Sequence, residues 1–213
     1  MKYQSWVVVI NNIQSTEWVK LPTYQEKKDS FDFAVISNLD LPLNGENKTF
    51  ERLKDLQADT ENPIDFVFHN GGFGNEIAQS HSKELDDYFD RLSELTQKIP
   101  YLALPGTPES NIQNPTLFNF RFMNPGIFSI ETTRNAIFTF VYKDTQFFSI
   151  DLDLYLKNYE IKKGMVILYW LNFVLAKSTA QWKTVIISTP LYCANYKDRY
   201  CVAISYFLNP LED

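Results

Sequence analysis

Short apolar segments that each end in a polar or glycine-rich loop are the feature that most constrains the fold. Segments with the spacing of a helix separate them, at Phe50–Leu56 and along the stripe Leu85, Tyr88, Phe89, Leu92 and Leu95, with Ser80 or Ser82 as candidate N-cap. The first three apolar segments are Phe33–Ile36, Pro63–Phe68 and Tyr101–Leu104. Strands that alternate with helices predict an α/β fold whose site lies at the carboxyl ends of the strands.

The remaining periodic segments extend this pattern toward both ends of the chain. Trp6–Ile10, the turn signal Asn11-Asn12 and Trp18–Leu21 predict a hairpin. Later predicted elements are strands at Ile137–Tyr142 and Phe147–Leu152 joined by residues 143–146, a helix at Gly164–Lys177 and a strand at Thr184–Ile187.

Composition excludes several classes of function. The 213 residues carry a net charge of −6 and contain no basic cluster, which excludes a nucleic-acid surface. The longest apolar stretch, Met165–Ala176, is interrupted by Asn172 and is shorter than the roughly 20 residues that span a bilayer. Only two histidines, His69 and His81, are present, which excludes sites that need three or four imidazoles.

Five segments, taken in order, carry a family resemblance: residues 31–39, 65–73, 99–109, 120–126 and 182–193. The second runs Asp-Phe-Val-Phe-His-Asn-Gly-Gly-Phe, the third Ile-Pro-Tyr-Leu-Ala-Leu-Pro-Gly-Thr-Pro-Glu, and the fifth Trp-Lys-Thr-Val-Ile-Ile-Ser-Thr-Pro-Leu-Tyr-Cys. This order resembles the motifs of calcineurin-like metallophosphoesterases, most closely the purple acid phosphatase branch. In that family the corresponding loops read Asp-Phe-Val-Leu-His-x-Gly-Asp-Leu-x-Tyr, Val-Pro-Tyr-x-x-x-Pro-Gly-Asn-His-Glu and His-Arg-Pro-Met-Tyr-Cys-Ser.

The resemblance implies a fold and a domain division. We expect a metallophosphoesterase-like sandwich of two mixed sheets flanked by helices, truncated at the C-terminus because the family's Gly-His-x-His motif does not follow Leu211-Glu212-Asp213. Residues 31–213 would form this incomplete domain. Residues 1–30 resemble the last hairpin and linker of the β-sandwich domain that precedes it in many members.

The metal-ligand positions implied by the resemblance hold other residues. In the family two metal ions, bridged by carboxylate oxygens, generate the hydroxide that attacks phosphorus. Here the aligned positions are occupied by Asn38, Gly72, Asn75, Thr107, Pro108 and Ser188. We therefore expect no catalytic residue, no metal and no cofactor at these loops.

Some residues near the loops are weak candidates for a remodelled metal site. They are Asp40, Asp65, His69 and Glu109. Each also has a simpler explanation, since Asp65 begins a strand, His69 ends one and the others can be solvated. Separately, the backbone amides of residues 71–74 are candidates for binding an anion, although the glycine-rich fingerprint is incomplete.

Cys193 and Cys201 match positions where the family often places a pair that closes a short surface loop. The pair is a candidate disulfide in an oxidising compartment and two inert thiols otherwise. The resemblance implies secretory or lysosomal ancestry, whereas residues 1–18 do not have the pattern of a signal peptide, so the compartment stays open.

The helix at 164–177 is apolar nearly all round. Trp170, Leu171 and Leu175 keep the expected buried face, and the residues added to the other faces are Val166, Ile167, Leu168, Tyr169, Phe173 and Val174. A helix of this kind is covered on both sides, either by a partner or by another segment of the chain. These six residues are interface candidates.

Together these observations predict a catalytically inactive phosphoesterase-like protein that acts as a structural or interaction subunit of a larger protein assembly. Two alternatives stay open. One is a metal-dependent phosphoesterase with a remodelled single-metal site, and the other is a module that binds an anion in the emptied cleft.

Overall fold

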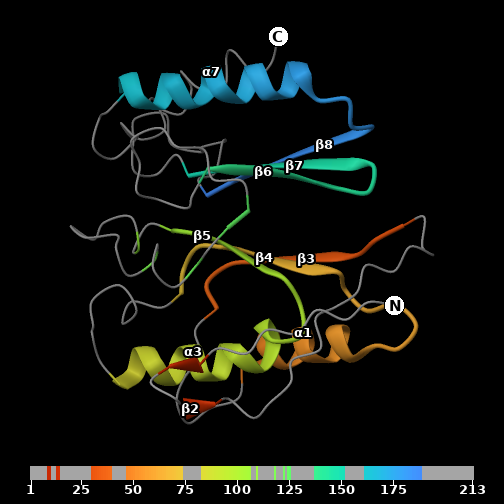
Figure 1. Cartoon of the computed structure of the whole chain (residues 1–213), viewed down its shortest axis with the longest axis vertical. Coiled ribbons are helices and arrows are strands. Elements are labelled where there is room, and N and C mark those ends of the chain that lie inside the picture. Colours follow the sequence, from red (N-terminus) through yellow and green to blue (C-terminus); the bar gives the residue numbers. More distant parts are fainter. Residues whose placement is uncertain are drawn as a thin grey trace. The chain divides into compact units, whose positions relative to one another are not determined.

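The computed structural model describes residues 9–10, 13–14, 30–39, 47–73, 83–106, 109, 118, 122, 124–125, 137–151 and 161–188. Two compact units make up the chain: Met1–His69 with Ser80–Leu102, and Asn70–Gln79 with Ala103–Asp213. The described elements comprise two three-stranded sheets, three helices and one pair of two-residue strands (Figure 1). The α/β prediction is therefore confirmed at this level.

The first sheet has the strand order β3-β4-β5, formed by β3 (Phe33–Ile36), β4 (Phe66–Asn70) and β5 (Tyr101–Leu104). Strands β3 and β4 are parallel, with Phe33 opposite Phe66 and their rings stacked at 5.2 Å between centroids. The side chains of Phe66, Val67 and Phe68 are all buried. A strand that is buried on both faces needs such a continuous apolar run.

Strand β4 begins three residues later than the segment predicted at Pro63–Phe68. Before Phe66 the backbone makes other bonds: the Ile64 amide donates to the Leu56 carbonyl, and the Asp65 amide donates to the Asp32 carbonyl at 2.7 Å. The strand then continues through His69 to Asn70, two residues past the predicted end. The apolar run alone did not reveal these bonds, because they link residues far apart in the sequence.

Two helices of the first unit, α1 (Lys48–Ala58) and α3 (Lys83–Thr96), cover one face of this sheet (Figure 1). Asn47 caps α1 by accepting a hydrogen bond from the Phe50 amide at 3.0 Å, which satisfies an otherwise unpaired N–H. Phe50 is fully buried. The predicted N-cap residues of α3, Ser80 and Ser82, lie outside the described residues.

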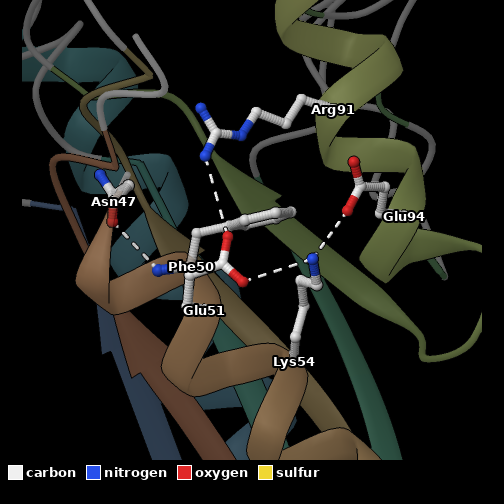
Figure 2. A network of polar contacts seen from close by, with 6 residues as sticks. All are labelled: Asn47, Phe50, Glu51, Lys54, Arg91 and Glu94. Atoms are coloured by element: carbon white, nitrogen blue, oxygen red, sulfur yellow. Dashed lines mark hydrogen bonds and ion pairs between the residues drawn. The ribbon is translucent and has the colours of Figure 1, made fainter. Parts of the chain in front are cut away.

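Charged side chains connect α1 to α3 above Phe50 (Figure 2). The Lys54 Nζ atom lies 2.8 Å from Glu94 Oε2 and 3.4 Å from Glu51 Oε2. A guanidinium nitrogen of Arg91 lies 3.8 Å from Glu51 Oε1. Both cations also lie over the Phe50 ring, at 5.5 and 5.6 Å from its centroid. The network thus covers the apolar contact between the two helices.

The second sheet belongs to the second unit and has the order β6-β7-β8, formed by β6 (Phe138–Tyr142), β7 (Thr145–Ile150) and β8 (Trp182–Ile187). β6 and β7 are antiparallel whereas β7 and β8 are parallel, so this sheet is mixed. Its helix α7 (Ile161–Lys177) starts three residues before the predicted position and runs along the sheet (Figure 1).

The turn between β6 and β7 is shorter than predicted. Thr145 and Gln146 pair with Tyr142 and Val141, so only Lys143 and Asp144 remain in the turn. Lys143 has a positive φ of 52°, the left-handed conformation that tight hairpin turns use.

Near the N-terminus, β1 (Val9–Ile10) pairs antiparallel with β2 (Ile13–Gln14). The described partner of β1 is thus β2, and the predicted strand at Trp18–Leu21 lies outside the described residues. Within the described part of the chain, no helix is long and apolar enough to cross a lipid bilayer.

Candidate functional site

A buried carboxylate organises the loops that follow β4 and β5 in the second unit. The Glu109 side chain is only 2% exposed. Its Oε2 accepts hydrogen bonds from the amides of Gly106 at 2.8 Å and Gly72 at 3.2 Å, while Oε1 accepts one from the Phe73 amide at 3.0 Å. One side chain therefore satisfies three backbone donors from two separate loops.

The two loops pass each other at backbone contact. A Cβ atom built on Gly71 would lie 2.4 Å from Gly106 Cα, and one built on Gly106 would lie 2.7 Å from the Gly72 nitrogen. Gly71 also has a φ of +76°, in the left-handed region that side chains disfavour. Glycine is thus required at both crossing positions for steric reasons.

Gly72 is the position expected to have lost a bridging aspartate, and it takes part in this crossing. It has a φ of +77° and donates its amide to Glu109. Having no side chain, it offers no ligand atom other than its backbone carbonyl. The next residue, Phe73, is buried and packs its ring against Phe122 at 4.9 Å.

Asn124 holds the end of β5 from within the same unit. Its Oδ1 accepts from the Ala103 amide at 3.2 Å, and its Nδ2 donates to the Ala103 carbonyl at 2.8 Å. This buried amide therefore pairs with one strand residue as a neighbouring strand would. Asn124 was not among the predicted site residues, since no local pattern in the sequence links it to position 103.

A second polar cluster lies where β7 and β8 end. Ser188, expected to replace a histidine ligand, donates its hydroxyl to Asp151 Oδ1 at 3.0 Å, and its amide donates to the Ile150 carbonyl. The side-chain Nδ2 of Asn70 donates a hydrogen bond to the Ile187 carbonyl at 3.0 Å. Asp151 is buried, which makes it a site residue that the sequence analysis missed.

Two buried oxygens of the second unit, Asn70 Oδ1 and Ser149 Oγ, have no hydrogen-bond partner among the described residues. Ser149 lies two positions before Asp151, which directly follows β7, so in an extended chain both side chains lie on the same side. The hydroxyl, carboxylate and amide groups of this region suit hydrogen bonding to a small polar group.

Asn38, the substitute at the first expected ligand position, belongs to the first unit. It has a φ of +52°, a conformation in which asparagine is enriched. The following residue, Leu39, is buried, and its carbonyl accepts a hydrogen bond from the Tyr88 hydroxyl at 3.3 Å. The loop after β3 is therefore anchored to α3.

Of the weak metal-ligand candidates, Asp65 and His69 belong to the first unit and are not brought together there. Asp65 precedes the first residue of β4 and His69 is its fourth, so their Cα atoms lie about 13 Å apart along the strand. Asp65 Oδ2 accepts from the Asp32 amide, whereas His69 Nδ1 shares a 2.7 Å hydrogen bond with the Tyr101 hydroxyl. The Glu109 carboxylate binds the three amides described above.

No group of three or more His, Cys, Asp or Glu side chains able to hold a metal ion occurs among the described residues. Several predicted positions lie outside that part of the chain. These are Asp40, Asn75, Thr107, Pro108, Cys193 and Cys201. Their roles stay predictions.

On α7 the six interface candidates differ in their exposure to solvent. Ile167 and Leu168 are only 2% and 7% exposed, so they belong to the buried face with Trp170 and Leu171. This corrects their assignment to the outer face, because helix periodicity places them opposite Val166 and Tyr169. The exposed large apolar side chains of the helix are Val166 at 46%, Tyr169 at 76% and Phe173 at 54%, joined by Met165 at 63%, which was not a candidate. Val174 is half-buried.

No protein-family model and no curated protein matches this chain.

Proposed function

We propose that this protein is a catalytically inactive, phosphoesterase-like subunit that contributes shape and binding surface to a larger protein assembly. The observation that carries the proposal is the Glu109 crossing. Its glycines and carboxylate hold the two loops together, while Gly72 within it offers no side-chain ligand. A framework kept without its ligand atoms fits a retained structural role.

The second polar cluster supports the same proposal. Ser188 donates its hydroxyl to the buried carboxylate of Asp151 at 3.0 Å, a bond between the residues that follow β7 and β8. A serine hydroxyl is also a poorer ligand than imidazole for the metals of phosphoesterases. Ser188 and Asp151 therefore serve as a hydrogen-bonded pair that joins the ends of β7 and β8.

The exposed apolar side chains of α7 support the proposal that the protein binds a partner. Monomeric soluble proteins rarely expose contiguous apolar patches unless the patch binds something. Four large exposed apolar residues on one helix are typical of an interface. The proposal accordingly assigns the binding role to α7.

Two measurements on the purified full chain test the inactive assignment. Hydrolysis of p-nitrophenyl phosphate and bis-p-nitrophenyl phosphate is followed with added Mg²⁺, Mn²⁺, Fe³⁺ or Zn²⁺, and metal content is measured after dialysis. We expect hydrolysis at the rate of the protein-free buffer and well under one metal ion per chain. Turnover that co-purifies with the chain, or one equivalent of retained metal, would contradict the assignment.

The assembly role has its own test. In a native extract of cells that produce the protein, size-exclusion chromatography with antibody detection should find it well above the 24.9 kDa of the free chain. Elution of all the protein as a 24.9 kDa species would contradict the subunit role and leave the inactive assignment standing.

A further inference from the structure

The outer face of α7 has a regular arrangement of apolar anchors. Met165, Val166, Tyr169 and Phe173 recur at spacings of three, four and seven residues, which places them along one side of the helix. We refer to these four residues as the α7 face. The opposite side of the helix, with Ile167, Leu168, Trp170 and Leu171, is buried. The α7 face is therefore not needed for the core of its own unit.

The charges of α7 differ from those of the whole chain. The helix contains Lys162, Lys163 and Lys177 and neither aspartate nor glutamate, while the chain carries a net charge of −6. Lys177 lies in the last turn, with its ammonium group 6.0 Å from the centroid of the Phe173 ring. Positive charge thus borders the apolar anchors of a helix within an acidic protein.

We propose that the α7 face binds an amphipathic helix of a partner protein whose apolar stripe is flanked by aspartate and glutamate. Helix-to-helix docking uses anchors at i, i+3, i+4 and i+7, and Val166, Tyr169 and Phe173 provide the i, i+3 and i+7 positions. Methionine and aromatic residues are enriched in interfaces. This inference rests on the proposed function of the chain as an interaction subunit, and it names the chemistry of the partner.

Charge selects this occupant over two others. A second copy docked through the same face would bring the lysines of two α7 helices together without an acidic residue from either helix to pair with them. An anionic membrane would attract Lys177 but repel a chain with a net charge of −6. An acidic partner helix complements the lysines and covers the apolar anchors.

The test uses two synthetic 21-residue helical peptides with the same leucine stripe, flanked by glutamate in one and by lysine in the other. Binding to the full chain is followed by fluorescence anisotropy. We expect the glutamate peptide to bind at least about tenfold more tightly than the lysine peptide, with an affinity that falls as salt increases.

Three variants locate the binding to the α7 face. Tyr169→Ser and Phe173→Ser should each weaken binding of the glutamate peptide about tenfold or more, since loss of an interface anchor commonly has this effect. Lys177→Glu should reduce the preference for the glutamate peptide. Val141→Ser is the matched control, because Val141 on β6 is an equally exposed apolar residue, at 61%, outside the α7 face. Circular dichroism checks that each variant folds.

Several outcomes would overturn the proposal: equal binding of both peptides, binding of neither, or an equal loss in Val141→Ser and Tyr169→Ser. A dimer in sedimentation that Tyr169→Ser abolishes would assign the face to a second copy. Flotation with phosphatidylserine vesicles that Tyr169→Ser abolishes would assign it to a membrane. None of these results depends on hydrolysis or metal content, so failure here is distinguishable from failure of the inactive assignment.

Discussion

Glu109 Oε2 accepts a hydrogen bond from the Gly106 amide at 2.8 Å, and the same carboxylate also reaches two amides of the loop after β4. The backbones of Gly71 and Gly106 cross beside these hydrogen bonds. Because the bonds converge on one buried side chain, the two loops form a single structural unit. Glu109 therefore acts through the backbone it holds, in contrast to its sequence-based candidacy as a metal ligand.

Replacing Glu109 should destabilise the fold in a graded manner. Glu109→Ala removes the acceptor of three amides and should lower the free energy of unfolding by at least about 3 kcal/mol. Glu109→Gln keeps one acceptor oxygen but places an NH₂ group near an amide donor, so we expect a smaller loss of about 1–3 kcal/mol. Urea denaturation measures both, with Asp55→Ala on the exposed side of α1 as control. Equal stability of Glu109→Ala and the control would contradict the role of Glu109.

The glycine crossing should not tolerate even one added methyl group. Gly71→Ala and Gly106→Ala each place a Cβ within 3.0 Å of backbone atoms, which a side-chain rotation cannot relieve. We expect each to lower the free energy of unfolding by about 3 kcal/mol or more, since overpacking and, at position 71, a positive φ both contribute. Asn172→Ala on exposed α7 is the control, with an expected change within about 0.5 kcal/mol. Thermal denaturation of the three variants decides the question.

Ser188 and Asp151 should show energetic coupling. In a double-mutant cycle of Ser188→Ala and Asp151→Ala, we expect an interaction energy of about 0.5–3 kcal/mol, as found for residues in one hydrogen-bonded network. Lys183 lies on β8, five residues before Ser188, or about 16 Å away along the extended chain. The cycle of Lys183→Ala with Asp151→Ala should therefore be additive, and equal coupling in both cycles would argue against a direct Ser188–Asp151 bond.

Local patterns in the sequence predicted the elements whose bounds depend on local residues. The strands at Phe33–Ile36 and Tyr101–Leu104 have the predicted bounds, because each is a short apolar run with breakers at its ends. The stripe through Leu92 and Leu95 is buried, as the helical spacing indicated. The periodicity of apolar residues indicates which face of a helix or strand is apolar, and that face packs into the core.

Features that depend on contacts between distant residues were less predictable. Nothing local pairs Asp65 with Asp32, yet the two residues bond to each other directly before β3 and β4 begin. Asp151 lies 37 residues before its partner Ser188, so it gave no motif to recognise. Glu109 was noticed for its carboxylate, but only the fold shows that amides converge on it. Sequence analysis thus found the loops and missed most of the bonds that hold them.

The ion pair of Lys54 with Glu94 should contribute little to stability, with a defined pH dependence. The hydrogen bond between them lowers the pKa of Glu94 and raises the pKa of Lys54. Their contribution is therefore fully present between the unfolded pKa values of about 4.3 and 10.4, lost as pH falls through the folded pKa of Glu94 and lost as pH rises through that of Lys54. Because both side chains are partly exposed, Glu94→Gln should cost only about 0.2–1 kcal/mol at pH 7. Urea denaturation at a series of pH values from 7 downward checks this, since the cost should shrink as the pH falls through the folded pKa of Glu94.

Tyr101 should make the first unit sensitive to alkali. Burial raises the pKa of its hydroxyl well above the usual value, with a smaller contribution from Tyr88. The neutral phenol is therefore favoured in the fold, and its contribution is complete below the unfolded pKa of about 10 and is lost as pH rises from there toward the folded value. Tyr101 should ionise only when the protein unfolds, and spectrophotometric titration should show that this late ionisation is lost in Tyr101→Phe. That variant also loses the hydrogen bond to His69 Nδ1, so at pH 7 it should be less stable by about 0.5–1.5 kcal/mol. Tyr169→Phe is the matched control, because its hydroxyl lies on the exposed α7 face. A late ionisation step that persists in Tyr101→Phe would contradict the assignment.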